Sequence, residues 1–231
     1  MNDNSHIEQA GGQEGRRTIR SYVLRQGRLT PGQENALTQH WPRLGCSTQG
    51  GLLDFSALFG NDQPVCLEIG FGMGDSLAEQ ARDKPHTNYV GIEVHRPGVG
   101  HVLMLSELFA LDNLRVFAED SIEVLNTSVP DRSLSLVQVF FPDPWHKKRH
   151  HKRRLINEEF LALVRGKLAS GGIVHVATDW VPYGEEIEAL FATQSYFRQV
   201  SAPARPQTKF ERRGLGLGHE ISDLAYQLIG E

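Results

Sequence analysis

The chain has 231 residues, of which 39% are hydrophobic and 23% charged, and its formal net charge is −4. This length supports one substantial globular domain, and the absence of any apolar run of about 18 residues excludes a transmembrane helix. The polar start of the chain lacks a signal-peptide core, and two cysteines without a CxxC pair favour a reducing, cytoplasmic compartment over a cysteine-held zinc site.

The first 45 residues differ in composition from the rest. Residues 1–15 are polar and glycine-rich, and we expect them to be disordered. Residues 16–28 hold five arginines and no acid, which is typical of an arm that meets phosphates or of a solvated basic tail. Prolines at 31 and 42 predict a short helix and then a linker. We therefore expect a disordered N-terminus with a basic arm over residues 1–45 and one folded domain over residues 46–231.

An apolar run at residues 65–69 meets three alternate glycines, Gly70, Gly72 and Gly74, and a predicted helix follows over residues 76–83. This order predicts a strand, a tight turn and a helix N-terminus, the first unit of a nucleotide-binding α/β sheet. Glycine allows positive φ and a close approach of the backbone to a ligand.

The turn also carries a carboxylate, Glu68. Because a carboxylate would repel the pyrophosphate that helix N-termini bind, a cationic ligand fits better. S-adenosylmethionine has an ammonium group and a sulfonium centre, and we interpret Glu68 as a contact to it. The alternative is that Glu68 only caps or pairs with a nearby basic group.

Acidic residues also follow the next two predicted strands. The strand over residues 88–92 precedes Glu93, which suits the carboxylate that accepts hydrogen bonds from ribose hydroxyls. The strand over residues 114–117 precedes Glu119 and Asp120. Asp120 is the candidate to accept from an adenine amino group, and Glu119 is its close competitor.

A fourth apolar strand, residues 134–141, ends in Pro142-Asp143-Pro144-Trp145. The two prolines restrict the backbone on either side of Asp143. Since ligands bind beyond the carboxyl ends of strands in open α/β sheets, we expect Asp143 beside the reacting centre, where rigid placement favours catalysis. A turn without a functional role is the alternative.

A basic run, residues 146–154, follows at once with six Lys or Arg and three His. It predicts a surface for a polyanion, although a solvated basic face is the common alternative. No acid or cysteine stands among the histidines, and the cations would oppose a dication, so we expect no metal. Further on, we predict a helix over residues 158–168, strands over 173–178, 196–200 and 223–229, a helix over 183–193, and a polar, glycine-rich loop over 208–219.

The alternation of strands and helices, the acidic glycine turn and the carboxylate after each of the first four strands resemble the class I S-adenosylmethionine-dependent methyltransferases. That resemblance implies an α/β, Rossmann-like fold with a seven-stranded, mostly parallel sheet flanked by helices. FPDPW followed by KKRHHKRR, then TKFERRG and GH, together with IRSYVLRQGRLTPGQ near the start, resemble the bacterial tRNA (guanine-N7-)-methyltransferase family. The likeness runs from about Arg20 to the end.

This resemblance implies methyl transfer from S-adenosylmethionine to N7 of a guanosine in the tRNA variable loop, with tRNA as partner. No obligate protein partner is evident from the sequence. Asp143 takes the catalytic role, and either Asp143 or Asp179 holds the guanine edge. The family's cofactor positions carry over to Glu68, Glu93, Asp120 and Asp143, its substrate positions to Lys147, Asp179, Thr208, Lys209, Phe210 and Glu211, and its RNA contacts to Arg149, His150, His151, Lys152, Arg153 and Arg154.

Three other classes share part of this pattern. A nicotinamide-dependent dehydrogenase shares the glycine turn and Glu93, but Glu68 and the basic run disfavour it. Methyltransferases that act on amino groups carry Asp or Asn followed by two prolines, whereas Asp143 stands between its prolines. A non-catalytic RNA-binding protein is disfavoured because the carboxylates are present at all the matched positions.

Overall fold

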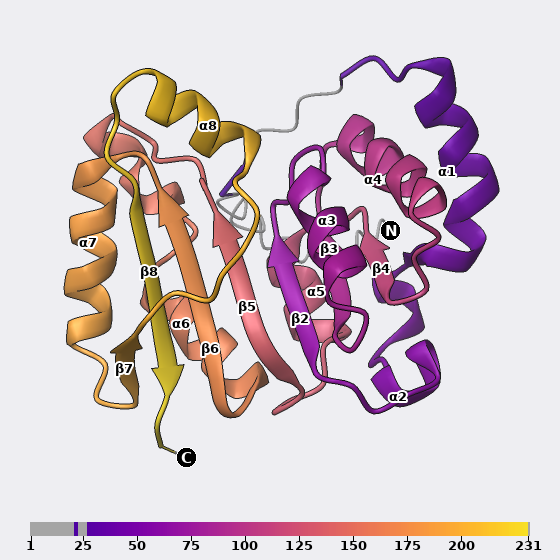
Figure 1. The fold of residues 1–231 in the computed structure, drawn as a ribbon. Helices are drawn as coiled ribbons and strands as arrows, with labels where there is room; N and C mark the ends of the chain where they lie inside the picture. Colours follow the sequence, from indigo (N-terminus) through magenta and orange to yellow (C-terminus); the bar gives the residue numbers. More distant parts are fainter. Residues whose placement is uncertain (1–20, 23–26, 231) are drawn as a thin grey trace, which may run out of the picture.

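An eight-stranded sheet runs through the residues that the computed structural model describes, 21–22 and 27–230, in the order β1-β4-β3-β2-β5-β6-β8-β7 (Figure 1). β8 is antiparallel to both of its neighbours, and all other pairs are parallel. The expected disorder of residues 1–15 and most of the basic arm lie outside the described residues. The strands are β1 (Gly45–Cys46), β2 (Val65–Ile69), β3 (Asn88–Ile92), β4 (Leu114–Phe117), β5 (Leu134–Phe140), β6 (Leu168–Thr178), β7 (Phe197–Val200) and β8 (Ser222–Leu228).

Helices cover both faces of the sheet (Figure 1). Leu77 of α3 and Leu103 of α4 belong to one buried cluster, and Leu125 of α5 and Phe160 of α6 belong to the other. No helix among these residues is both long and apolar enough to cross a membrane. The helices are α1 (Pro31–Leu44), η1 (Thr48–Gly50), α2 (Phe55–Phe59), α3 (Asp75–Asp83), α4 (Arg96–Leu108), α5 (Ser121–Thr127), η2 (Lys148–Arg153), α6 (Glu158–Lys167), α7 (Val181–Ala192) and α8 (Lys209–Gly216).

The strand order reverses between β2 and β5, since β3 and β4 lie on one side of β2 and the later strands on the other. At such a reversal, the connections leave in opposite directions and open a crevice beyond the carboxyl ends of the strands. The expected mostly parallel α/β fold is confirmed. The expected seven strands become eight because Gly45 and Cys46 pair with β4, and a two-residue strand leaves no periodic signal in a sequence.

Helix α1 packs on the domain that we expected to begin at residue 46. A capping box starts the helix, since the Gln33 amide accepts from the Thr30 backbone and the Thr30 hydroxyl accepts from the Gln33 backbone. The helix continues past Pro42 to Leu44, which is fully buried. Gly100 of α4 lets α1 approach closely, because a Cβ there would lie 2.8 Å from the Cβ of Gln33.

Two predicted boundaries were wrong. Residues 208–219 are not a loop throughout, because Thr208 and Glu211 form a capping box that starts helix α8 despite the nearby glycines. Strand β6 begins at Leu168 instead of residue 173. It passes through Gly171, whose φ is +74°, and its register against β5 shifts there, which is typical of a bulge.

Candidate active site

The glycine turn after β2 forms one wall of the crevice. Gly70, Gly72 and Gly74 have φ values of +74°, +61° and +80°, a region that strains any residue with a side chain. The turn is tied to the next strand because the Gly70 N–H donates to the Ile92 carbonyl at 2.8 Å. Three alternate glycines at this place follow from the backbone conformation that the turn requires.

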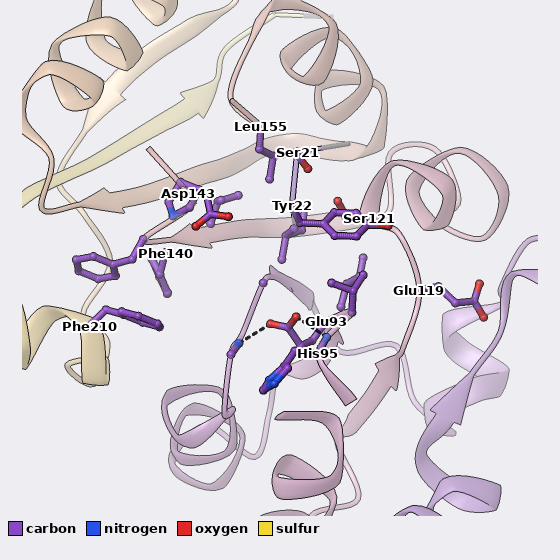
Figure 2. A pocket seen from close by; sticks show the side chains of 18 residues that line it. Ser21, Tyr22, Glu93, His95, Glu119, Ser121, Phe140, Asp143, Leu155 and Phe210 are labelled. Carbon is purple, nitrogen blue, oxygen red and sulfur yellow. Dashed lines mark hydrogen bonds between the residues drawn. The ribbon is translucent and has the colours of Figure 1, made fainter. Parts of the chain in front are cut away.

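Glu93 closes the turn from the end of β3. One carboxylate oxygen accepts from the Gly72 N–H at 2.8 Å and the other from the His95 N–H at 2.9 Å (Figure 2). Each oxygen keeps a second lone pair, so the half-buried carboxylate can still accept from a ligand. Glu93 therefore joins the glycine turn to β3 and lines the cavity beyond it.

Gly98, in the first turn of α4, packs directly on the glycine turn and was not among the predicted site residues. A Cβ on Gly98 would stand 1.8 Å from the carbonyl oxygen of Gly72, so the helix and the glycine turn are in direct backbone contact. Glycine disfavours helix interiors, and the pair Gly98 and Gly100 in a helix was the available signal of close approach.

The turn after β5 presents Asp143. Phe141 and Trp145 flank it with φ values of +53° and +47°, which aromatic residues rarely adopt and which cost about 1–3 kcal/mol each. The Phe141 N–H donates to the Ala177 carbonyl of β6 at 2.7 Å. The backbone on both sides of Asp143 is thus strained and held in place, while the Asp143 side chain is exposed to the cavity.

Arg154 supports the Asp143 turn from the protein interior. It was expected among the RNA contacts, but it is only 3% exposed, donates to the Pro144 carbonyl at 2.8 Å and pairs with Glu186. Its guanidinium also lies 4.6 Å from the centroid of the Tyr183 ring. A buried cation with these partners stabilises the turn, and its removal would leave buried groups unsatisfied.

The turn is also fixed from its outer side. The Trp145 indole N–H donates to the Ser21 carbonyl at 3.0 Å, and the Arg153 guanidinium lies 3.8 Å from the centroid of the Trp145 ring. Arg153 donates as well to the Tyr22 carbonyl at 3.1 Å. The segment Ser21–Tyr22 therefore reaches the mouth of the cavity (Figure 2).

These walls enclose a cavity of about 460 Å³ at the switch point, within the range of small-molecule sites. Five of the predicted site residues line it: Gly70, Gly72, Glu93, Asp143 and Phe210. The other predicted cofactor and substrate positions do not line it, namely Glu68, Gly74, Asp120, Lys147, Asp179, Thr208, Lys209 and Glu211.

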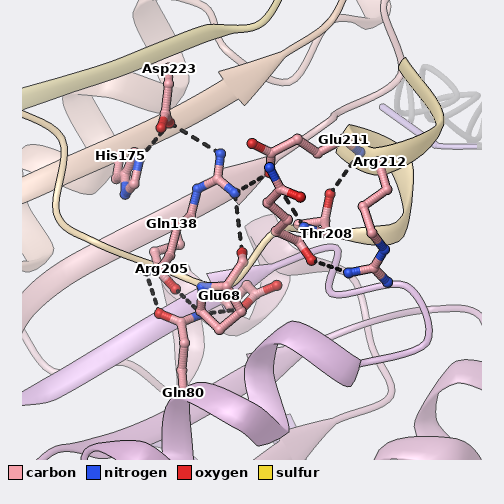
Figure 3. A network of polar contacts seen from close by, with 11 residues as sticks. Glu68, Gln80, Gln138, His175, Arg205, Thr208, Glu211, Arg212 and Asp223 are labelled. Atoms are coloured by element: carbon pink, nitrogen blue, oxygen red, sulfur yellow. Dashed lines mark hydrogen bonds and ion pairs between the residues drawn. The ribbon is translucent and has the colours of Figure 1, made fainter. Parts of the chain in front are cut away.

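Glu68 lies below the turn instead of in the cavity. Its side chain is 2% exposed and accepts from the Gln80 amide at 3.4 Å (Figure 3). Burial raises the pKa of Glu68 to about 8, although the nearby Arg205 lowers it. At neutral pH this carboxyl is therefore mostly protonated, as expected for a group held away from water.

Replacement of Glu68 by glutamine should make stability less sensitive to pH. A carboxyl with a raised pKa in the folded state contributes stability below its unfolded pKa of 4.5 and loses it as pH rises to about 8. Glutamine stays neutral, so the stability of E68Q relative to wild type should rise by about 2–4 kcal/mol between pH 5 and pH 8. Urea denaturation at both pH values measures this, with the exposed Glu123→Gln as control. An equal difference at both pH values would contradict the assignment.

The two acids after β4 are both engaged by backbone N–H groups. Asp120 caps α5 and accepts from Ile122 and Glu123 at 2.9 and 3.2 Å. Glu119 lines the cavity, but its carboxylate accepts from the Thr48 N–H at 3.1 and 3.3 Å and points away from the cavity (Figure 2). A contact from either carboxylate to adenine stays a prediction.

Helix α8 brings part of the predicted substrate segment to the cavity mouth. Phe210 is 56% exposed, lines the cavity and lies 6.4 Å from Phe141 with a 24° angle between the rings. Asp179 lies under the same helix, because Gly214 packs on its Cβ, and it contacts His219 at 3.3 Å. The structure thus connects Asp179 to α8 and Asp143 to the cavity.

The basic run forms the short helix η2 beside the Asp143 turn. Lys147, Lys148, Arg149 and Lys152 are exposed, whereas His150 stacks on Trp145 at 5.9 Å. Desolvation, followed by the neighbouring cations with Arg149 first among them, lowers the pKa of His150. No group of His, Cys, Asp or Glu side chains within the described part of the chain is arranged to hold a metal ion.

The fold and the site together define a class. A family model described as "Putative methyltransferase" matches residues 62–224. Two solved structures share the fold. The 16S rRNA methyltransferase KamB matches with a TM-score of 0.54 and 14% identity, over 76% of this chain and 93% of KamB. The precorrin-6y C5,15-methyltransferase of Geobacter metallireducens GS-15 matches with a TM-score of 0.51 and 14% identity, over 73% of this chain and 81% of that protein. The protein is a class I S-adenosylmethionine-dependent methyltransferase.

Closer relatives identify the family within this class. A tRNA (guanine-N(7)-)-methyltransferase of Pseudoalteromonas translucida (strain TAC 125) is 50% identical over 97% of both chains. One of Escherichia coli O6:K15:H31 (strain 536 / UPEC) is 51% identical over 92% of both chains. The chain belongs to the tRNA (guanine-N(7)-)-methyltransferase family.

Proposed function

We propose that the protein transfers a methyl group from S-adenosylmethionine to N7 of a guanosine in tRNA, with 7-methylguanosine and S-adenosylhomocysteine as products. The observation that carries this proposal is the position of Asp143, which shares one cavity with Glu93 and the glycine turn. Family membership supports the same reaction, and the resemblance of the motifs favours the variable loop as the region that is modified.

The cavity suits the cofactor. Gly70 and Gly72 line it with backbone alone, and a Cβ on Gly70 would meet no atom within 4 Å, so the space over the turn is open to a ligand. We assign Glu93 to the ribose hydroxyls, because its oxygens have lone pairs left. When bound, S-adenosylmethionine supplies an electrophilic methyl group on a sulfonium sulfur.

Methyl transfer to guanine N7 requires little from the protein beyond correct placement of the base and the cofactor. Guanine N7 carries an in-plane lone pair and no proton, so no general base is required. Rate then depends on alignment of N7 with the methyl group and on a negative group near the ring, which becomes positive as the bond forms. Asp143 lines the cavity on a strained, anchored turn, and we assign this role to it.

The target base must leave its stack to reach such a cavity, as in other base-modifying enzymes. Phe210 stands at the cavity mouth with a large exposed ring face, and aromatic rings stabilise unstacked bases by about 1–3 kcal/mol. Asp143 or Asp179 can accept from the guanine N1–H and amino group. The contact of Asp179 with His219 under α8 favours Asp143 for the guanine edge.

Neutralising the exposed cations of η2 should weaken tRNA binding in a salt-dependent way. We expect the triple variant Lys148→Gln, Arg149→Gln, Lys152→Gln to reduce the slope of log Kd against log salt by about 2 to 3. Each phosphate contact that is lost lowers the number of counterions released when tRNA binds. Filter binding over a range of salt concentrations measures it. Arg154 stays unchanged, since it supports the Asp143 turn.

A second triple variant provides the matched control. Arg43→Gln, Arg82→Gln and Arg198→Gln remove the same charge at the other end of the strands, away from the cavity. Arg43 and Arg82 lie in the last turns of α1 and α3, and Arg198 lies near the start of β7. The slope of this control should stay at the wild-type value. Equal slopes for both triple variants would show that η2 is not the RNA surface.

Incubation of the purified chain with methyl-labelled cofactor and unmodified bulk tRNA, followed by nucleoside analysis, tests the proposed function. Label in 7-methylguanosine supports it, and label in another nucleoside contradicts the N7 assignment. The same assay tests whether the chain acts without a protein partner. The two cysteines are free and buried, which suits a reducing compartment, and we place the protein in the cytoplasm with its substrate.

A further inference from the structure

A buried cation outside the cavity joins the elements that build the site. Arg205 lies between β7 and α8, and its side chain is 4% exposed. It donates to Glu211 at 2.5 Å and to Asp223 of β8 at 3.3 Å (Figure 3). One guanidinium therefore links the start of α8 to the sheet.

The contact with Glu211 reaches the capping box of α8. The same Glu211 oxygen that accepts from Arg205 also accepts from the Thr208 N–H at 3.3 Å, and the Glu211 N–H donates to the Thr208 hydroxyl at 3.1 Å. This first turn of the helix carries Phe210 into the cavity. Arg205 is thus linked through Glu211 to the first turn of α8.

The other contacts of Arg205 reach the Asp143 side of the site. Its guanidinium lies 4.5 Å from the centroid of the Phe140 ring, and Phe140 directly precedes the strained turn that presents Asp143. The Asp223 carboxylate is itself held by His175 of β6, whose fully buried Nε2 lies 2.7 Å from the Asp223 Oδ1. Arg205 therefore contacts both walls between which the target base has to fit.

We propose that Arg205 is a positioning residue for methyl transfer, which acts through Glu211 to hold the Thr208–Glu211 turn at a set distance from the Asp143 turn. The inference rests on the proposed function, because it takes this gap to be the place of the guanine. Lysine does not replace arginine here, since a single ammonium lacks the planar fork that two carboxylates share.

Arg205→Ala should lower kcat for tRNA methylation on the order of 10- to 100-fold, the cost of misplacing a reacting group by about 1 Å. The Kd for S-adenosylmethionine should stay near the wild-type value, because Arg205 does not line the cavity. Arg212→Ala on the same helix is the matched control, since Arg212 is exposed and bonds only to the Gln207 carbonyl among the contacts described. An unchanged kcat for Arg205→Ala would overturn the proposal.

Two further readouts separate positioning from a merely structural role. Millimolar guanidinium should restore part of the kcat of Arg205→Ala, whereas sodium chloride at equal ionic strength should not. In a double-mutant cycle, Arg205→Ala should cause little further loss of kcat in the Glu211→Gln background, because the two residues act as one unit. Fully additive losses, or no response to guanidinium, would contradict the inference.

Arg205→Lys keeps the proposal testable if the alanine variant does not fold. This variant retains the buried charge, and we expect both its kcat and its melting temperature to lie between those of wild type and Arg205→Ala. A wild-type kcat would overturn the positioning role. If the wild-type chain itself forms no 7-methylguanosine, the proposed function fails, and that outcome is distinct from failure of the inference about Arg205.

Discussion

Replacement of Asp143 by alanine should lower turnover of tRNA methylation at least about 100-fold, the usual loss when one electrostatic stabiliser is removed from a site. Asp143 stands on a turn that two prolines, two strained aromatic residues and Arg154 hold in place. Since its carboxylate is exposed to the cavity, the substitution removes charge beside the reacting ring. Single-turnover rates with saturating cofactor measure the chemical step.

Two companion variants make this test specific. Asp143→Asn keeps the size of the side chain, so a loss close to that of alanine assigns the effect to charge. Asp179→Asn should cost less, because Asp179 contacts His219 and α8 instead of lining the cavity. A near-wild-type rate for both Asp143 variants would remove Asp143 from the mechanism, and a larger loss for Asp179→Asn would transfer the guanine edge to that residue.

Gly98→Ala should weaken binding of S-adenosylmethionine by roughly 10- to 100-fold, since it displaces the glycine turn, and a misplacement of about 1 Å can cost about 100-fold in rate. The added Cβ would stand 1.8 Å from the Gly72 carbonyl oxygen, a backbone atom that no rotamer change can move away. The glycine turn must therefore shift, and with it the N–H that donates to Glu93. Isothermal titration with the cofactor measures the loss of affinity.

Gly166→Ala is the matched control for that substitution. Gly166 is also helical, in α6, but a Cβ there meets no atom within 4 Å. Alanine should stabilise this helix by about 0.5–1 kcal/mol and leave cofactor affinity unchanged. Equal affinities for the Gly98 and Gly166 variants would show that the contact between α4 and the turn does not shape the cofactor site.

Local sequence patterns were sufficient for the elements that build the sheet. The apolar run before Gly70 and the acid after each strand predicted β2, β3, β4 and β5 in their order, because a buried parallel strand needs continuous apolar residues. The same patterns placed Glu93 and Asp143 at the carboxyl edge, where the structure has them. Glu93 comes directly after β3 and Asp143 follows the end of β5 by a short turn, so chain connectivity brings both residues to this edge.

Two charged residues that were expected to contact ligands are buried in the structure, and those contacts stay predictions. Arg154 ends a run of exposed cations, yet it is buried against Glu186 and Pro144. Glu68 precedes the glycine turn, yet its carboxyl points into a buried polar cluster with Gln80. A sequence does not state which side of a turn a long side chain takes, since that depends on residues distant in the chain.

The sequence by itself determined the α/β fold, the glycine turn and the placement of Glu93 and Asp143 at the cavity, because period, turn chemistry and strand ends are local properties. Only the tertiary structure decided the contact of Gly98 with Gly72, the burial of Arg154 and the link that Arg205 forms between α8 and the sheet. Each of these depends on atoms that folding brings together from separate elements, and such distances have no local signature in the chain.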